Sequence, residues 1–251
     1  TVRDRVEFGC TTCSKKGRTS KGERELSEFL ISLGVGEVET SVRHLPSLRE
    51  VDAAIHSLKV AVEFNGVYWH STAIRPDSDF HLKKYLAARE DGYLLIQVWE
   101  DDWRDRKERT KMRIRSILGA LPPAPPRSAV RIGNGGVSVC KGDKELFSAK
   151  CMARGKSLII SDVHTTVDYA QALSLLMTSV RSTHPALQYM IVRDDRCSPM
   201  ETHLASLGFK MTREESPRMT YLSNGTRTPF TTKESSHMVF DAGVGVFRIA
   251  L

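Results

Sequence analysis

The spacing of apolar positions divides residues 21–119 into helices and strands. Leu26, Phe29, Leu30 and Leu33 recur at intervals of three and four, which predicts a helix beginning after Ser20. Shorter apolar runs predict strands at 38–42, 50–55, 59–64 and 93–98. Helical spacing of apolar residues predicts two more helices, at 78–91 and 101–118. This order predicts a compact α/β domain.

A proline-rich stretch separates this part of the chain from the rest. Residues 121–126 read Leu-Pro-Pro-Ala-Pro-Pro, which is stiff and cannot be helical, so we predict a linker at 120–128. It would divide a polar arm (1–20) and a first domain (21–119) from a second α/β module (129–251). The pattern in that module predicts strands at 129–132, 137–140, 157–160, 187–192, 219–222 and 238–248, and helices at 167–180 and 199–207.

The composition narrows the class of protein. Lys and Arg total 37 of the 251 residues and Asp and Glu total 30, so the net charge of +7 favours a polyanionic partner such as DNA. No apolar run approaches the roughly 18 residues that a membrane-spanning helix needs. The five Cys are odd in number and irregularly spaced, which favours a reducing compartment over a disulfide framework.

Two carboxylates fall on neighbouring predicted strands. Asp52 lies inside one strand, and Glu63 lies at the end of the next, after Val60-Ala61-Val62. Carboxylates are costly to bury unless they are paired or bind a metal ion. Two of them on adjacent antiparallel strands can face one side and share a divalent cation such as Mg²⁺. A strand-end Glu taken by itself is more often a residue at the rim of a sheet.

Two histidines and a lysine follow within a short distance. His70 closes an aromatic cluster, and His81 and Lys84 share one face of the predicted helix 78–91 because they are three residues apart. A histidine can exchange a proton near neutral pH, and a lysine can hold a phosphate. Glu23, three residues after Ser20, fits a helix-capping box as well as it fits a catalytic role.

The order of these motifs resembles phage-type homing endonucleases of the PD-(D/E)xK superfamily, relatives of the very short patch repair (Vsr-like, EDxHD) endonucleases. The resemblance runs from about Cys10 to Leu118. It rests on Ser20-Lys-Gly-Glu23, Glu50-Val-Asp52-Ala, Val60-Ala-Val-Glu63-Phe-Asn65-Gly-Val-Tyr-Trp-His70 and His81-Leu-Lys-Lys84, continued by Asp91-Gly92 and by Val98-Trp-Glu100-Asp-Asp-Trp103.

The resemblance implies a restriction-endonuclease-like mixed sheet flanked by helices that cleaves double-stranded DNA with Mg²⁺ or Mn²⁺. In that family pattern Asp52 and Glu63 would bind the metal, and the catalytic set would comprise Glu23, Asp52, Glu63, His70, His81 and Lys84. Such an enzyme would be phage-encoded and act in the cytoplasm of a bacterial host. A homodimer is one arrangement that would let it cut both strands.

The chain departs from the superfamily at one central position. The superfamily's catalytic Lys is expected at position 65, where this chain has Asn65. The general base therefore stays open between His70, His81 and a metal-bound hydroxide. Two alternatives remain open as well: a mismatch-directed repair nickase, and a catalytically weak DNA-binding module.

Two thiols near the start of the chain are spaced as in half of a zinc ribbon. Cys10 and Cys13 form a CxxC pair, but a zinc site needs four ligands and the sequence has no second CxxC. Zn²⁺ is expected there only if further ligands come from outside this chain. Otherwise the two residues are free thiols on a polar arm.

The second module resembles, more loosely, an acetyltransferase-type (GNAT) fold found in some phage endonucleases. The likeness rests on Met190-Ile-Val-Arg193-Asp194-Asp195, Leu207-Gly208-Phe209 and Pro217-Arg-Met-Thr-Tyr221. Acetyl transfer would need a glycine-rich pyrophosphate loop at a helix start, which Arg154-Gly155 alone does not supply. We therefore expect this module to have a DNA-binding or scaffolding role rather than to transfer acetyl groups. The basic residues that could contact phosphates are Arg127, Arg131, Lys150, Arg154, Lys156, Arg193 and Arg196, together with Arg104, Arg106, Lys107, Arg109, Lys111, Arg113 and Arg115.

Overall fold

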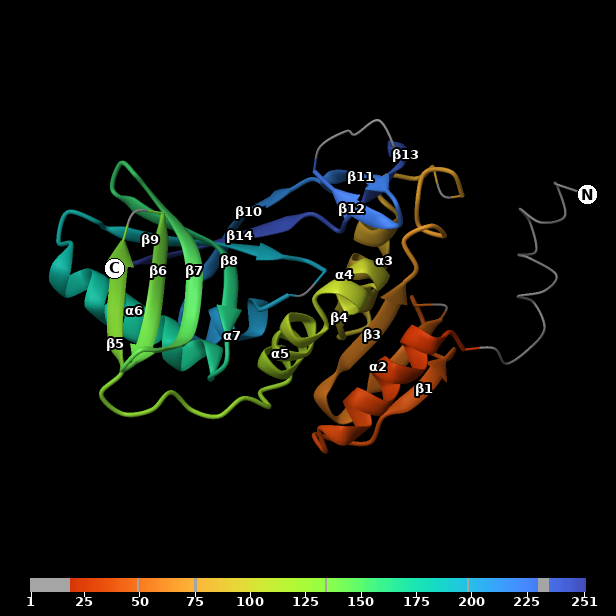
Figure 1. The fold of residues 1–251 in the computed structure, drawn as a ribbon, viewed down its shortest axis with the longest axis horizontal. Helices are drawn as coiled ribbons and strands as arrows, with labels where there is room; N and C mark the ends of the chain where they lie inside the picture. The colour runs from red at the N-terminus through yellow and green to blue at the C-terminus, as the bar shows by residue number, and fades with distance from the viewer. Residues whose placement is uncertain (1–18, 49, 75, 134, 198, 230–234) are drawn as a thin grey trace, which may run out of the picture.

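The computed structural model describes residues 19–251 except 49, 75, 134, 198 and 230–234 (Figure 1). The chain forms two separate β-sheets with helices on their faces, and a third, small sheet. This confirms the α/β class. Among the described helices, none is long and apolar enough to cross a membrane. Cys10 and Cys13 lie outside the described residues.

The first sheet has four strands in the order β1-β2-β3-β4. These are β1 (Glu39–Val42), β2 (Val51–Ile55), β3 (Val60–Asn65) and β4 (Leu94–Trp99), as the apolar runs predicted. The first three strands are antiparallel, and β3 and β4 run parallel. The parallel pair requires a crossover connection, which the predicted helix α3 (Phe80–Glu90) provides.

Helices cover both faces of this sheet. Helix α2 (Lys21–Ser32) begins at a complete capping box, in which Ser20 and Glu23 each accept the other's backbone N–H. Its residues Leu26 and Leu30 pack on one face of the sheet with Val62, whereas Ala88 of α3 packs on the opposite face with Ala61. The strands are therefore buried on both sides, which explains their nearly continuous apolar runs.

The helix predicted at 101–118 is two helices. They are α4 (Glu100–Asp105) and α5 (Lys107–Ile117). Arg106 lies between them with φ −134° and ψ 34°, outside the helical region, so the chain changes direction there. As a result α5 lies against the second sheet instead of continuing along the first (Figure 1).

The second sheet has seven strands in the order β10-β14-β9-β8-β7-β6-β5. Its strands are β5 (Ala129–Gly133), β6 (Gly136–Lys141), β7 (Lys144–Arg154), β8 (Ser157–Thr165), β9 (Tyr189–Asp195), β10 (Lys210–Glu215) and β14 (Val244–Ala250). Only β8 and β9 pair in parallel. Helices α6 (Tyr169–Thr183) and α7 (Glu201–Ser206) pack together on one face, and α5 contacts β8. The sequence pattern missed β7 and β10.

Between β10 and β14 the chain returns to the first sheet. It forms β11 (Met219–Ser223), β12 (Thr226–Thr228) and β13 (Ser235–Phe240), so the single strand predicted at 238–248 is two strands, β13 and β14. Leu222 and Val239 of this small sheet pack against Val67 and Trp99. The two predicted domains thus share apolar contacts, and the division at 120–128 stays a prediction.

Candidate active site

The two carboxylates singled out from the sequence lie beside each other on one face of the first sheet. Ala53 of β2 is opposite Val62 of β3, so the next residues in this antiparallel register are Asp52 and Glu63. Directly opposite residues point to the same face. In the parallel pair with β4, Glu63 is opposite Gln97. This is the face that α3 covers.

Lys84 of α3 closes the site over Glu63. Its Nζ donates to Oε1 of Glu63 at 2.5 Å, and the two side chains are 17% and 13% exposed. The second carboxylate oxygen of Glu63, Oε2, is buried and has no hydrogen-bond partner among the described residues. A buried oxygen without a partner is uncommon and marks a position for a proton or a ligand.

Burial raises the pKa of both carboxyl groups. The pKa of Asp52 rises to about 7, first because the group is buried and next because Glu63 lies close to it. The backbone N–H of Phe64 donates to Oδ2 of Asp52 at 2.6 Å and partly offsets this rise. Burial also raises the pKa of Glu63, and the Lys84 ammonium opposes that rise. The site therefore holds a carboxyl group that exchanges its proton near neutral pH.

Glu23 serves the start of α2 first. Its Oε2 accepts from the Ser20 N–H at 2.9 Å, and its own N–H donates to Ser20 Oγ at 3.1 Å. Its negative charge also contributes to the raised pKa of Asp52 and of Glu63. Glu23 is thus a capping residue at the margin of the site.

The two histidines form a neighbouring cluster. The rings of His70 and His81 are 4.9 Å apart, and the ring of His81 is 4.7 Å from that of Trp99. His81 is buried, and its Nδ1 is 2.7 Å from Oε1 of Gln97. Since Gln97 is opposite Glu63 in the sheet, the histidine cluster adjoins the carboxylates along one face.

Sequence reasoning missed Gln97. It is buried in β4, its Nε2 donates to the backbone oxygen of His81 at 3.3 Å, and its own backbone N–H donates to Cys197 at 2.7 Å. It also accepts from Asn65 Nδ2 at 3.4 Å. A polar residue within the apolar run 93–98 was the available signal.

The second half of the chain supports α3 from outside. The hydroxyl of Tyr85 donates to Glu201 at 3.1 Å, and the guanidinium of Arg196 lies 5.5 Å from the centre of the Tyr85 ring. Tyr85, Cys197 and Ala242 form one buried cluster. The helix that carries His81 and Lys84 is therefore held in place by residues more than a hundred positions away.

One carboxylate oxygen of Asp52 and one of Glu63, the expected metal ligands, already accept hydrogen bonds within the chain. The donors are the Lys84 ammonium at Glu63 and the Phe64 N–H at Asp52. Among the described residues, three ligand atoms converge only at Glu39, His44 and His56, in another part of the sheet.

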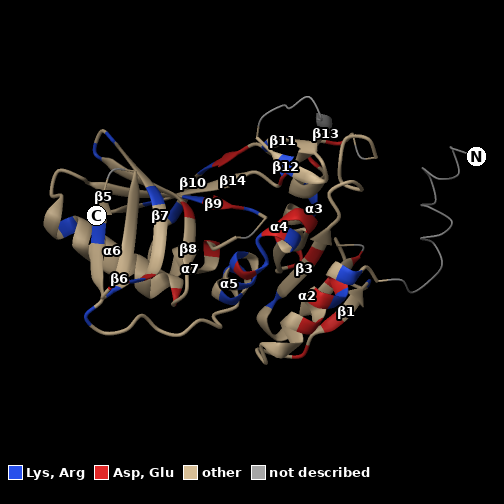
Figure 2. Ribbon diagram, viewed as in Figure 1, with Lys and Arg blue, Asp and Glu red and all other residues tan. Residues whose placement is uncertain are grey.

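The basic residues of 104–115 are engaged within the molecule. Figure 2 shows Lys and Arg gathered on α5 close to acidic residues of α4. Each has an intramolecular partner: Arg104 with Asp105, Arg106 with Asp102, Lys107 with Glu25, Arg109 with Asp162, Lys111 with Glu108, Arg113 with Asp194, and Arg115 with the ring of Phe29. In the second module Lys150, Arg193 and Arg196 pair with Asp162, Glu215 and Glu214. Each of these cations therefore has an acidic or aromatic partner within the chain.

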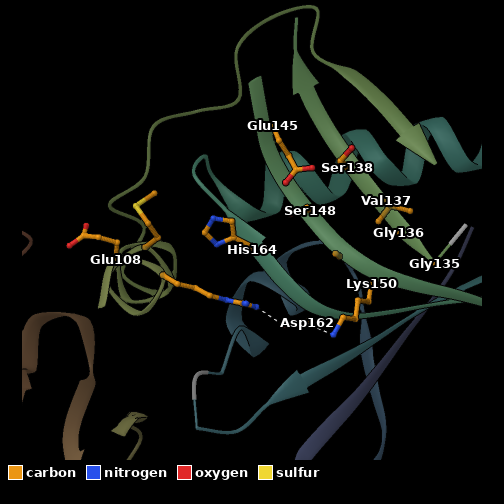
Figure 3. Close-up of a pocket in the computed structure, with 13 residues that line it drawn as sticks. Glu108, Gly135, Gly136, Val137, Ser138, Glu145, Ser148, Lys150, Asp162 and His164 are labelled. Carbon is orange, nitrogen blue, oxygen red and sulfur yellow. Dashed lines mark hydrogen bonds and ion pairs between the residues drawn. The ribbon is translucent and has the colours of Figure 1, made fainter. Parts of the chain in front are cut away.

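A cavity of about 690 Å³ lies between α5 and strands β6 to β8 (Figure 3). Its lining mixes charges: it includes Glu108 and Arg109 of α5, and Lys150, Asp162 and His164 of the sheet. Burial lowers the pKa of His164, with the positive charge of Arg109 adding to the effect. Lys150 and Arg109 both bind Asp162, so this carboxylate ties the helix to the sheet.

The parallel strands of the second sheet diverge beside this helix. Pairing between β8 and β9 covers Ser157–Ile160 and Tyr189–Val192, although both strands continue further. Arg113 of α5 lies at this divergence and contacts Asp194 of β9 at 3.5 Å and the Val163 oxygen of β8 at 3.5 Å. Arg113 therefore lies between the diverging strands.

Comparisons with known proteins find likeness in structure only. No family model matches the chain, and no curated protein matches its sequence. Solved structures similar to it include the ribosomal-protein-S18-alanine N-acetyltransferase from Escherichia coli (10% identity, 51% of this chain and 71% of that chain, TM-score 0.29). Another is an acetyltransferase from Bacillus subtilis in complex with CoA (9% identity, 46% of this chain and 76% of that chain, TM-score 0.31). A third is the N-terminal domain of the ribosomal-protein-alanine acetyltransferase from Clostridium acetobutylicum (9% identity, 51% of this chain and 94% of that chain, TM-score 0.30).

These findings correct the expectations taken from the motif resemblance. The similar solved structures are acetyltransferases, so the assignment to phage-type PD-(D/E)xK homing endonucleases and the activity of a DNA endonuclease are wrong. A restriction-endonuclease-like sheet is not shown, whereas the expected α/β class is.

The expected cofactor and partner are wrong for the same reason. Mg²⁺ or Mn²⁺ at Asp52 and Glu63 is contradicted, as is double-stranded DNA, because the similar structures are acetyltransferases and one was solved with CoA. In the structure Lys84 is ion-paired with Glu63, and the basic residues of α5 that were expected to bind phosphates have acidic or aromatic partners in the chain.

Proposed function

We propose that this chain is an enzyme that works by general acid–base catalysis, with Asp52 as the group that exchanges the proton. The observation that carries the proposal is the pairing of Asp52 with Glu63 on one sheet face, where burial and the Glu63 charge raise the pKa of Asp52 to about 7. A catalytic acid or base works best when its pKa lies near the working pH. Strongly shifted carboxyl groups concentrate at active sites.

The other residues of the predicted set would have distinct roles. The Glu63–Lys84 ion pair sets the electrostatic potential at Asp52, because the charge of Glu63 raises the pKa of Asp52 and that of Lys84 lowers it. The buried Oε2 of Glu63 would accept a hydrogen bond from substrate or water. His70 and His81, fixed by Gln97 and Trp99, would form the adjoining wall. Residues 21–119 would hold the site, and 129–251 would buttress it.

Acetyl-CoA does not fit the second sheet of this chain. The turn before α6 reads Thr166-Val167-Asp168, with no glycine, and the carboxylate of Asp168 caps the helix by accepting from Gln171 N–H at 2.8 Å. A negative charge at that helix start disfavours a pyrophosphate. Gly155 lies in the turn between β7 and β8, and α5 with Arg113 lies between the diverging strands. We derive no step through this cofactor.

The proposal is tested by titrating the carboxyl groups directly. Carbon-13 NMR of protein labelled at the Asp and Glu carboxyls should show two Asp signals with midpoints near pH 7, those of Asp52 and Asp194. One of the two should be absent from Asp52→Asn. Asp143→Asn, in the exposed turn between β6 and β7, is the matched control and should keep that signal. Turnover of any substrate found by screening should rise or fall with the same midpoint. A spectrum in which Asp52→Asn removes no signal with a midpoint near pH 7 would remove the basis of the proposal.

A second measurement separates the proposal from acyl transfer. Isothermal titration with acetyl-CoA should give no heat of binding above that of dilution. Saturable binding to the wild-type chain, lost when α5 is altered by Arg113→Met, would instead favour acyl transfer at the second sheet.

A further inference from the structure

Three potential metal ligands converge at one end of the first sheet, away from Asp52. Glu39 belongs to β1, His44 follows β1 in the connecting loop, and His56 begins the short 3₁₀-helix (His56–Leu58) after β2. One ligand atom from each of them lies within 4.8 Å of the others. Two imidazoles and one carboxylate form a donor set typical of Zn²⁺ and related divalent metals.

The distances between these donor atoms are close to those of a coordinated metal. His56 Nε2 is 2.8 Å from Glu39 Oε2, and His44 Nδ1 is 3.7 Å from Glu39 Oε1. Ligands about 2.0–2.2 Å from a tetrahedral Zn²⁺ are separated by a little over 3 Å. Small side-chain rotations would therefore let the three atoms bind one ion without moving the backbone. The rings of His44 and His56 already lie side by side, 5.6 Å apart.

The orientation of His56 is fixed by a second partner. Its Nδ1 is 2.6 Å from the hydroxyl oxygen of Tyr93, and Lys59 lies over the Tyr93 ring at 4.9 Å. Without a metal, Nε2–H donates to the Glu39 carboxylate and Nδ1 accepts from the Tyr93 hydroxyl. When a metal ion takes the place of the proton on Nε2, Nδ1–H can donate to the Tyr93 oxygen instead. Metal-binding histidines usually have such a second hydrogen bond, which fixes the tautomer and the ring.

The loop that carries His44 is also held in place. The carboxylate of Asp91 accepts from the backbone N–H groups of Ser47 and Leu48, the shortest distance being 2.9 Å. Arg43 donates to Glu50 at 3.0 Å across the same loop. A preformed ligand loop lowers the entropy that metal binding must overcome.

We propose that Glu39, His44 and His56 bind a single Zn²⁺ ion, with water in the fourth position. The ion would join the edge strand β1, the following loop and the end of β2. The site is separate from the acid–base site, which lies elsewhere on the same sheet. The site does not depend on the role proposed for Asp52.

Cobalt absorption and zinc calorimetry test this site on the full chain. The protein is prepared without a histidine tag, treated with a chelator and dialysed, and carries Cys10→Ser and Cys13→Ser so that those thiols cannot bind metal. Added Co²⁺ should then give visible d–d absorption that saturates at one Co²⁺ per chain, without a thiolate charge-transfer band. Zn²⁺ should displace it and raise the melting temperature.

The variants separate the site from adventitious surface binding. His44→Ala is the decisive change, because its side chain is 63% exposed and its loss leaves the fold intact. His44→Ala and Glu39→Gln should each weaken the affinity for Zn²⁺ by tenfold or more. Tyr93→Phe should weaken it by about tenfold, because the hydroxyl that orients His56 is lost. Two control variants should change the Zn²⁺ affinity less than twofold: His184→Ala, which removes an exposed histidine of the second module, and Asp52→Asn. Absence of binding, or binding that His44→Ala leaves unchanged, would overturn the proposal.

Discussion

At the scale of single residues, the pKa of Asp52 has a consequence for stability. Its pKa of about 7 in the folded protein lies above the ordinary Asp value of 3.8, so between these pH values the unfolded chain releases this proton first. Ionisation then favours unfolding, and the free energy of unfolding falls as pH rises across this window, by about 4 kcal/mol at most. Asp52→Asn should remove this fall while keeping an oxygen for the Phe64 N–H. Urea denaturation at pH 4.5 and pH 8 measures the free energy of unfolding of both proteins.

The quantity that tests the pKa of Asp52 is the difference in the free energy of unfolding between Asp52→Asn and wild type. The other carboxyl groups remain in both proteins and cancel, except Glu63, whose charge interacts with that of Asp52. Asp52→Asn and wild type should be nearly equally stable at pH 4.5, with the variant more stable at pH 8. Parallel pH profiles for the two proteins would contradict the raised pKa.

At the scale of elements, α2 depends on a glycine for its contact with β3. A Cβ placed on Gly22 would lie 2.3 Å from Cζ of Phe64, a buried ring that cannot withdraw easily. Gly22→Ala gains helix propensity worth up to about 1 kcal/mol, but the clash costs about 1–3 kcal/mol. We expect a net loss of stability in urea denaturation.

A compensating substitution checks the cause of that loss. In the background Phe64→Leu the clash is removed, so Gly22→Ala should be neutral or stabilising relative to Phe64→Leu alone. An equal loss in both backgrounds would show that the contact with Phe64 is not responsible.

At the scale of the whole molecule, Arg113 joins α5 to the second sheet. Burial raises the pKa of Asp194 to about 7, and the nearby Arg113 guanidinium opposes this rise. Arg113→Met leaves the ionised carboxylate without its partner, which should cost about 3 kcal/mol at pH 8. At pH 5 the carboxyl is protonated, so the loss should be smaller. Urea denaturation at the two pH values measures the difference.

The double variant isolates this pair. Arg113→Met with Asp194→Asn should recover most of the stability lost at pH 8, because no buried charge remains. If the double variant is no more stable than Arg113→Met alone, the loss comes from packing of the Arg113 side chain and not from charge.

Helix and strand positions in the first half could be predicted because they depend on local pattern. The capping box at Ser20 and the apolar spacing that follows it specify α2, and continuous apolar runs specify β2 to β4. In contrast β7 was missed because Glu145 and Lys150 interrupt its apolar positions, and its pairing with β6 and β8 stabilises it. The break at Arg106 was also missed, because contact of α5 with the second sheet decides it.

The sequence by itself determined the α/β class, most elements of the first sheet and the residues Asp52, Glu63 and Lys84 as a group worth testing. Local spacing carries that information because it fixes which side chains share a face. The tertiary structure alone decided that Lys84 lies against Glu63 and that Gln97 holds His81. It also decided that the basic residues of α5 are ion-paired within the chain. Charge and motif order cannot show which partner neutralises a side chain, because that depends on contacts between segments far apart in sequence.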